Sequence, residues 1–213
     1  MKKKCDVNKS EEETNVNDSY NSDSDVCFVS ETVSCNFFFP IDRQWQETKC
    51  IELNINFENP LTCMNFPVKS LLAEPLGIKP IVGDGNCWFR SISYIITGSE
   101  EHHTIVRKKL VHFMRSEPMC KRIRNAFPPD DIKHDMDRNG VWATDIEIFA
   151  TAEMLDTDIF IYSKISNDKK IWQTFSKTFI SKEGNTEADD FNKSVYITNE
   201  SGVHFEVVLS VKK

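Results

Sequence analysis

The stretch GDGNCWFRSISYIITG, residues 83–98, sets two glycines, an aspartate and an asparagine directly before a cysteine and a run of apolar residues. Gly83 and Gly85 give the backbone conformations that other residues avoid, and they remove side-chain bulk beside Cys87. The apolar run predicts a helix over Trp88–Thr97, closed by the glycine that follows it. A buried structural cysteine does not need such a lead-in, so the stretch indicates a thiol placed for attack.

The predicted start of this helix also suits catalysis by a thiol. A helix that begins at Cys87 directs its unpaired N–H groups at the sulfur, and their partial positive charge favours the nucleophilic thiolate. The free amides of Cys87 and of the loop residues Gly85 and Asn86 can hold an oxyanion when a carbonyl is attacked. The loop alone also fits a second interpretation, in which Cys87 is a small buried hydrophobe after an Asp-Gly turn.

A thiolate nucleophile needs a base, and His204 is the histidine that suits this role. The other four fit solvated surface imidazoles on a predicted helix or in a polar loop: His102, His103, His112 and His134. In VHFEVVLSV, residues 203–211, side chains alternate between the faces of a strand. One face is apolar and is expected to pack on the core: Phe205, Val207, Leu209 and Val211. His204 and Glu206 share the other face, where the carboxylate is placed to reach the imidazole.

Three segments in this order resemble the ovarian tumour (OTU) domain cysteine proteases. DGNCWFRSIS, residues 84–93, is similar to their Asp-Gly-Asn-Cys-x-Phe-Arg signature, and HFEVV, residues 204–208, resembles their closing strand. NGVWATDIEIFATAEMLDTDIFIYS, residues 139–163, is similar to their central Trp-Gly-Gly-x-x-Glu helix and the strand after it. The resemblance covers residues 70–213 and implies an α+β, papain-like fold in which helices flank a mixed β-sheet.

The resemblance implies a thiol-dependent deubiquitinase, which hydrolyses isopeptide or peptide bonds after the C-terminal glycine of ubiquitin or of polyubiquitin chains. Matched by position, Cys87 is the nucleophile, His204 the general base and acid, and Glu206 the third member of the triad. Asp84 matches the family's loop aspartate, and its carboxylate is expected to pin loop amides into the oxyanion hole. Trp142 is expected to pack beside the ubiquitin tail. This chemistry needs no metal and no organic cofactor.

The sequence departs from the family pattern in two places. Glu206 stands where the family has Asp or Asn, and a displacement of about 1 Å in a catalytic group can cost about a hundredfold in rate. Asp84 or a loop asparagine could orient the imidazole instead. Ala143 and Thr144 replace the paired glycines after Trp142, which is expected to alter the cleft wall. Two alternatives stay open: a weak or inactive OTU-fold module that binds ubiquitin or a partner as a scaffold, and a thiol enzyme for another acyl substrate.

Composition divides the chain into three parts. Residues 1–35 are rich in Asn, Ser, Asp and Glu without an apolar period, which predicts a disordered acidic tail. Residues 36–69 form an N-terminal extension that holds either short strands or a segment that docks on a partner. In it, Ile51, Leu53, Ile55 and Phe57 alternate as in a strand. Residues 70–213 form the OTU-like domain, in which helix patterns come first and strand patterns late, as in an α+β domain.

Several further elements are expected in residues 70–213. HHTIVRKKLVHFMRS, residues 102–116, has helical spacing, and Thr144 and Glu147 at capping-box spacing begin a third helix. DIFIYS and KIWQTF predict strands. The runs KSVYIT and VHFEVVLSV, separated by NESG, predict a hairpin.

Charge and cysteine spacing bound the function classes. The net charge of the 213 residues is −7, with 12 acidic and 7 basic side chains in the first 69, so the rest is near neutral. It shows no Lys/Arg stripe, which disfavours a nucleic-acid partner. Neither a signal-peptide pattern nor a bilayer-length apolar run is present, so we expect no membrane partner and a location in the cytoplasm or nucleus. We also expect a monomer. The seven cysteines contain no Cys-x-x-Cys pair, which disfavours a zinc site.

Overall fold

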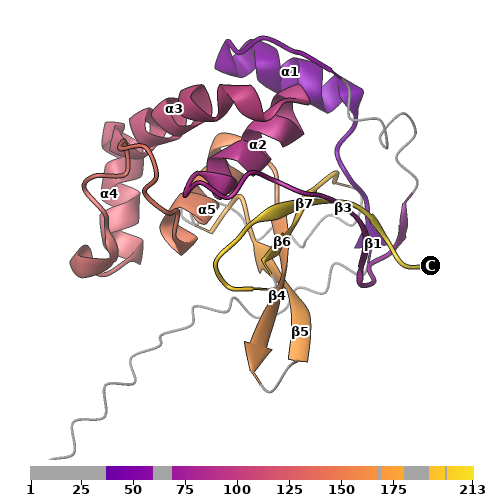
Figure 1. The fold of residues 1–213 in the computed structure, drawn as a ribbon. Coiled ribbons are helices and arrows are strands. Elements are labelled where there is room, and N and C mark those ends of the chain that lie inside the picture. Colours follow the sequence, from indigo (N-terminus) through magenta and orange to yellow (C-terminus); the bar gives the residue numbers. More distant parts are fainter. Residues whose placement is uncertain (1–36, 60–68, 167–168, 180–191, 200) are drawn as a thin grey trace, which may run out of the picture.

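The computed structural model describes residues 37–59, 69–166, 169–179, 192–199 and 201–213. The predicted tail, residues 1–35, lies outside the described residues. The described elements follow in chain order (Figure 1): β1 (Phe37–Phe38), α1 (Arg43–Leu53), β2 (Ser70–Leu71), β3 (Pro75–Lys79), α2 (Cys87–Thr97), η2 (Glu100–His102), α3 (His103–Arg115), α4 (Glu117–Ala126), η3 (Pro129–Asp131), α5 (Asp145–Met154), β4 (Ile159–Ser166), β5 (Lys169–Phe175), β6 (Val195–Asn199) and β7 (Glu206–Val211).

The main sheet is mixed, as the family resemblance implies. Its strand order is β3-β7-β6-β4-β5, in which β4 and β6 are parallel and the other neighbours are antiparallel. The helices gather above and to one side of this sheet in the view of Figure 1. A separate pair of short strands, β1 and β2, is antiparallel. The α+β class and the helix-flanked mixed sheet are therefore confirmed.

Helix α2 runs through the core and begins at Cys87. Its sequence is apolar on nearly all sides, and nine of its eleven residues are buried, as expected of a helix with neighbours all round. The helix ends where the sequence predicts, at Gly98, whose φ of 80° is left-handed. A Cβ at Gly98 would lie 1.9 Å from the carbonyl oxygen of Asn59, so this end tolerates only glycine.

Helix α1 replaces the strand that the alternation at residues 51–57 predicts. Asp42 caps the helix by accepting a hydrogen bond from the N–H of Trp45 at 3.0 Å. The helix then packs on the C-terminal end of α2, where Gln46 Nε2 donates to the carbonyl of Ile95 at 2.8 Å. Cys50 Sγ donates to the next carbonyl, that of Ile96, at 3.4 Å. Capping and these contacts with α2 outweigh the local alternation, and they satisfy carbonyls that a helix end leaves free.

Strand β7 is buried on both faces, which changes one expectation. Val207 belongs to the main core cluster, and Phe205 and Leu209 pack against it, as predicted. Val211, expected on the same face, packs with Val208 in a second cluster on the far side of the sheet. Register shifts in the pairing of β3 with β7 interrupt the simple alternation.

No helix among the described residues is both long enough and apolar enough to cross a lipid bilayer.

Candidate active site

The loop before Cys87 has the tight geometry that its glycines suggest. Gly85 has a φ of 82°, and a Cβ there would lie 2.6 Å from the backbone oxygen of Gly140. Glycine is therefore required at Gly85 on two counts, backbone conformation and space. Cys87 follows as the first residue of α2 and is 8% exposed, so its thiol lies at the edge of the core.

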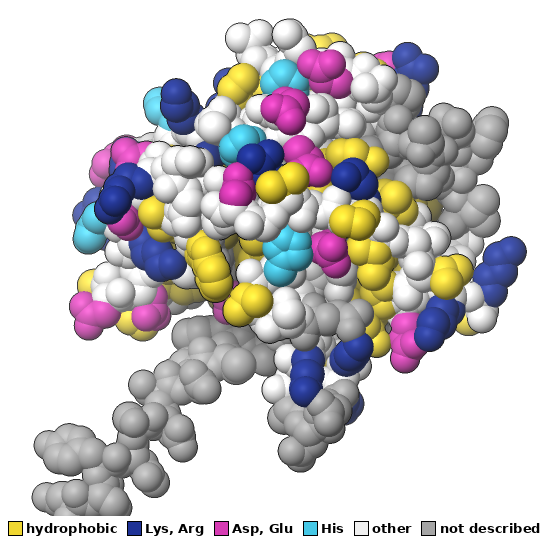
Figure 2. Space-filling model, viewed as in Figure 1, with side chains coloured by type: hydrophobic (Ala, Val, Ile, Leu, Met, Phe, Trp, Pro, Cys, Tyr) yellow, Lys and Arg dark blue, Asp and Glu magenta, His cyan; other side chains and the backbone are white. Residues whose placement is uncertain are grey.

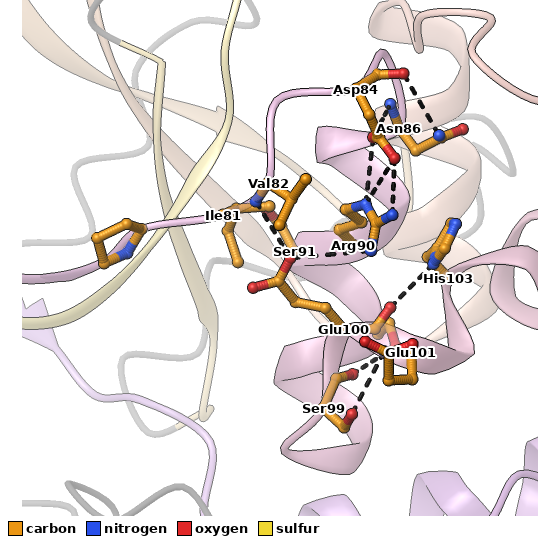
Figure 3. A network of polar contacts seen from close by, with 12 residues as sticks. Ile81, Val82, Asp84, Asn86, Arg90, Ser91, Ser99, Glu100, Glu101 and His103 are labelled. Atoms are coloured by element: carbon orange, nitrogen blue, oxygen red, sulfur yellow. Dashed lines mark hydrogen bonds and ion pairs between the residues drawn. The ribbon is translucent and has the colours of Figure 1, made fainter.

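Asp84 braces this loop through Arg90, one helical turn beyond Cys87 (Figure 3). The guanidinium donates through Nη2 to Oδ2 of Asp84 at 2.6 Å and through Nε to both carboxylate oxygens at 3.1 Å. The N–H of Asn86 also donates to Oδ1 of Asp84, at 3.0 Å. The hydrogen bonds from Arg90 hold the pKa of the Asp84 carboxyl well below its usual range. Asp84 therefore pins the loop by binding the amide of Asn86, and among the residues that the structure describes no hydrogen bond joins it to His204.

Glu100 fixes the preceding part of the loop. Its Oε2 accepts a hydrogen bond from the N–H of Val82 at 3.1 Å, and its Oε1 forms an ion pair with Nζ of Lys79 at 3.2 Å. The loop is thus tied to helix α2 at Asp84 and to η2 at Val82. Such bracing holds catalytic groups in one geometry before the substrate arrives.

Replacing Asp84 with asparagine is expected to remove a pH-dependent part of the stability. The folded chain keeps this carboxylate ionised beside Arg90, whereas in the unfolded chain it titrates near pH ~4. Below that pH the unfolded state binds more protons, so the stabilisation is fully present above pH ~5 and is lost as the pH falls below ~4. Urea unfolding of both proteins at about pH 7, 5, 4 and 3 measures the difference in free energy of unfolding.

Asp137→Asn serves as the control for this series. Asp137 pairs with Arg115 at 3.5 Å on an exposed surface, so its loss should change stability little at any pH. A difference between the wild type and Asp84→Asn that stays constant from neutral to acid pH would contradict the role given to the Asp84–Arg90 pair.

Some backbone amides of the loop donate a hydrogen bond within the described residues and others do not. Asn86 donates its N–H to Asp84, and its side chain is buried against Arg107 and the N–H of Gly140. Within the described residues, the N–H groups of Gly85 and Cys87 make no hydrogen bond. From the sequence we expect the amides of both Gly85 and Asn86 to bind the oxyanion. In the structure the amide of Asn86 is bonded to Asp84, so Gly85 and Cys87 are the available donors.

His204 precedes strand β7 and is oriented by backbone groups. Its Nε2 lies 3.0 Å from the carbonyl oxygen of Ile81, and because a carbonyl only accepts, Nε2 carries the proton. The backbone N–H of His204 donates to the side-chain Oδ1 of Asn199 at 3.2 Å. A Cβ at Gly83 would lie 3.6 Å from Cε1 and 3.7 Å from Nδ1 of the ring. In the neutral imidazole, Nδ1 is then the free basic nitrogen, on the side of the ring that faces the cysteine loop.

The residues after Cys87 and after His204 pack on each other, although they are far apart in the sequence. The ring of Trp88 meets that of Phe205 edge to face, with centroids 5.1 Å apart. Ser91 Oγ donates to the carbonyl of Phe205 at 3.3 Å. The start of α2 and the start of β7 are therefore held together, and with them the segments that carry the thiol and the imidazole.

Glu206 does not orient the imidazole in this structure. It is the first residue of β7 and pairs with Thr198 of β6. Within the described part of the chain, no hydrogen bond joins its carboxylate to His204, whose Nε2 is already occupied by the carbonyl of Ile81. The imidazole of His204 is therefore bound by the Ile81 carbonyl and not by the carboxylate of Glu206.

Replacing Glu206 with alanine is expected to leave kcat within about threefold of the wild-type value, because the ring keeps its bond to the Ile81 carbonyl. A triad acid that holds the imidazole would cost far more, about 10⁴-fold in the serine-protease case. Steady-state hydrolysis of an acyl substrate by the two proteins decides between these values. A fall of a hundredfold or more, on the scale that a misplaced catalytic group causes, would show that Glu206 holds the ring.

Trp142 lies at the surface, 54% exposed, in the segment between η3 and α5. Its carbonyl accepts a hydrogen bond from Nζ of Lys133 at 3.1 Å. The capping box that begins α5 follows at once: the N–H and Oγ1 of Thr144 both donate to Oε2 of Glu147, each at 2.7 Å. Burial raises the pKa of the Glu147 carboxyl. The indole is thus presented to solvent by a segment that is anchored on both sides.

The surface near Gly83 and His204 is partly apolar. Val82 and Val203, which precede Gly83 and His204, are exposed by 53% and 54%. On the face shown in Figure 2, hydrophobic side chains form a strip to the right of the centre and a smaller group to its left, and charged side chains of both signs are interspersed with them. Among the described residues, no group of three or more His, Cys, Asp and Glu side chains is arranged to hold a metal ion.

Sequence reasoning missed several residues of this site. Arg90 belongs to the motif of residues 84–93, and an acid six residues before a base at a helix start hints at the ion pair that forms. The carbonyl of Ile81 and the side chain of Asn199 carry no sequence signal. Arg107 precedes two lysines in the sequence and looks like part of a solvated face, but it is 3% exposed.

The comparisons with known proteins point to one family. The family model described as OTU-like cysteine protease matches residues 82–205. Two Arabidopsis thaliana proteins, ovarian tumor domain-containing deubiquitinating enzymes 9 and 7, are similar at 31% identity over 90 residues and 30% over 97. These matches cover 41% and 44% of this chain but only 25% and 26% of the two relatives. The chain therefore matches about a quarter of the length of these relatives.

A solved structure, the viral OTU domain protease of Dera Ghazi Khan virus, has a TM-score of 0.47 and 18% identity to this chain. The match covers 64% of this chain and 81% of that one.

Proposed function

The chain belongs to the OTU-like cysteine protease family, and on this premise we propose that it is a thiol-dependent deubiquitinase that cleaves the bond after the C-terminal glycine of ubiquitin. The names of the two plant relatives support ubiquitin as the substrate. The observation that carries the proposal is the placement of His204, with Nε2 bonded to the Ile81 carbonyl and the ring against Gly83 of the cysteine loop.

In the first step the Cys87 thiolate attacks the carbonyl carbon of the terminal glycine, and a C–S bond forms. The carbonyl oxygen becomes an oxyanion, which the free N–H groups of Cys87 and Gly85 stabilise. His204, protonated on both nitrogens at this stage, donates the proton of Nδ1 to the leaving lysine amine. The C–N bond breaks, the amine departs, and ubiquitin remains attached to the enzyme as a thioester.

In the second step His204 acts as the base. Its Nδ1 takes a proton from a water molecule, and the resulting hydroxide attacks the thioester carbon. The oxyanion forms again in the same place and collapses, the C–S bond breaks, and ubiquitin leaves with a free carboxylate. The bond from Nε2 to the Ile81 carbonyl keeps a proton on Nε2 in both steps, so Nδ1 is the nitrogen that gives and takes the proton.

The proposal is tested with ubiquitin that carries a fluorogenic amide at its C-terminus, together with a panel of defined di-ubiquitins. We expect the full chain to release the fluorophore and to cleave at least one linkage. Binding of ubiquitin without any cleavage would support a scaffold module instead. Hydrolysis of simple thioesters without cleavage of any ubiquitin substrate would indicate a thiol enzyme for another acyl substrate.

A further inference from the structure

Arg107, on helix α3, is the most completely buried arginine near the cysteine loop. Only 3% of it is exposed, and its guanidinium lies 3.7 Å from the centre of the Phe89 ring. Burial of a charged group in the core is costly unless its donors are satisfied. The partners of this guanidinium are therefore informative about what it does.

The partners of Arg107 lie in two separate segments. Nη1 donates to the carbonyl of Met136 at 2.9 Å, and Nη2 donates to the carbonyl of Val141 at 2.9 Å, both in the segment that leads to Trp142. Nη2 also donates to Oδ1 of Asn86, the residue before Cys87, at 2.9 Å. One planar group thus joins the segment that leads to Trp142 to the loop that carries the nucleophile.

Asn86 completes the junction. Its Oδ1 accepts a second hydrogen bond, from the N–H of Gly140, at 2.9 Å. The same two segments touch directly, because Gly85 lies so close to the oxygen of Gly140 that a Cβ would be 2.6 Å from it. The contact between the two segments is hydrogen-bonded at Asn86 and sterically tight at Gly85. Its geometry depends on the Arg107 guanidinium, which is bonded to both segments.

We propose that Arg107 is a positioning residue, which fixes the segment 136–142 against the loop 83–87 and so holds Trp142 in a set position relative to Cys87. It does not touch the substrate. It acts through Asn86 and through the carbonyls of Met136 and Val141. The consequence for catalysis rests on the proposed function, whereas the coupling of the two segments does not.

Arg107→Lys is the main test. An ammonium offers its donors from one atom, so it cannot reach acceptors that Arg107 binds through two nitrogens. We expect the backbone amides of both segments to exchange with deuterium at least about tenfold faster than in the wild type. We also expect kcat for the fluorogenic ubiquitin substrate to fall by about 30- to 100-fold, as for a displacement of about 1 Å. KM should change less than kcat.

Arg122→Met is the matched control. Arg122 forms a partly buried ion pair with Glu153 at 3.0 Å, which joins α4 to α5 away from the cysteine loop. Its loss should lower the melting temperature without accelerating exchange in segments 83–87 and 136–142. If Arg107 contributed only to stability, Arg107→Lys would likewise lower the melting temperature without accelerating exchange in these two segments.

A second pair of variants decides the matter even where Arg107→Lys fails to fold. Asn86→Asp keeps an oxygen acceptor for Arg107 and Gly140, whereas Asn86→Ala removes it. We expect near wild-type exchange of segment 136–142 in the aspartate variant and accelerated exchange in the alanine variant. Equal protection of this segment in the wild type, Arg107→Lys and Asn86→Ala would overturn the inference. Because exchange needs no substrate, a wild type that does not cleave ubiquitin would refute the proposed function alone.

Discussion

Cys87→Ala is expected to abolish hydrolysis of ubiquitin substrates, with kcat/KM reduced by at least about 10⁴-fold. Alanine has no nucleophile, and the free N–H groups at the start of α2 cannot by themselves replace the covalent step. The fold should survive, because the Cys87 thiol makes no side-chain hydrogen bond among the described residues and alanine leaves only a small gap. Hydrolysis of the fluorogenic substrate, measured beside a thermal melt, separates lost chemistry from lost structure.

Cys120→Ala is the matched control for this variant. Cys120 is a free, half-buried thiol on α4, and its sulfur accepts a hydrogen bond from Nη2 of Arg124 at 2.7 Å. Its removal should leave kcat/KM within about twofold of the wild type, since surface changes away from a site have small effects. If Cys87→Ala kept more than about a tenth of the activity, on the scale of the effects above, another group would have to be the nucleophile.

His204→Gln is expected to lower kcat/KM by about 10³- to 10⁴-fold. A glutamine amide can still donate to the carbonyl of Ile81, which preserves the packing near Gly83, but it cannot carry a proton to or from the substrate. The loss should therefore appear in kcat, with binding of ubiquitin retained. Single-turnover kinetics and a ubiquitin titration measure the two quantities separately.

His102→Gln provides the comparison. His102 is half-buried, and its Nε2 lies 3.0 Å from Oε1 of Glu58, at the end of α2 opposite Cys87. We expect its loss to leave turnover unchanged. If turnover by His204→Gln stayed within about tenfold of the wild type, smaller than the share usually assigned to general acid–base catalysis, His204 would not be the base.

Local signals in the sequence predicted the elements that carry the site. The glycine after Thr97 marks the end of α2 because the left-handed conformation there excludes other residues. Thr144 and Glu147 mark the start of α5 because the capping box forms within one turn. These elements are set by contacts between near neighbours, which a sequence pattern shows directly.

Two helices and one strand pairing that depend on distant partners were not predicted. Helix α1 forms where the alternation at residues 51–57 suggests a strand, because its polar and thiol groups meet the end of α2. Helix α4 received no prediction at all. The parallel pairing of β4 with β6 brings together strands separated by β5, which no periodicity reveals.

The candidate site shows the same division. Side chains within one short motif, such as Asp84 and Cys87, can be picked from the sequence, since their chemistry and spacing are visible. The partner of the His204 ring could not be, because a backbone carbonyl has no residue-type signal and Glu206 offered a carboxylate at a plausible distance. Arg107 was hidden for a related reason: its role depends on segments that only the fold brings together.

The most direct test of the central claim uses ubiquitin that ends in an electrophile in place of its C-terminal carboxylate. The claim is that folding places one activated thiol, Cys87, beside the His204 ring in a groove for the ubiquitin tail. Incubation with the full chain, followed by mass spectrometry of the digested adduct, is predicted to show one ubiquitin per chain, attached to Cys87 and absent from Cys87→Ala. Attachment to Cys120 or Cys50, or no adduct in a chain that is fully folded, would contradict it.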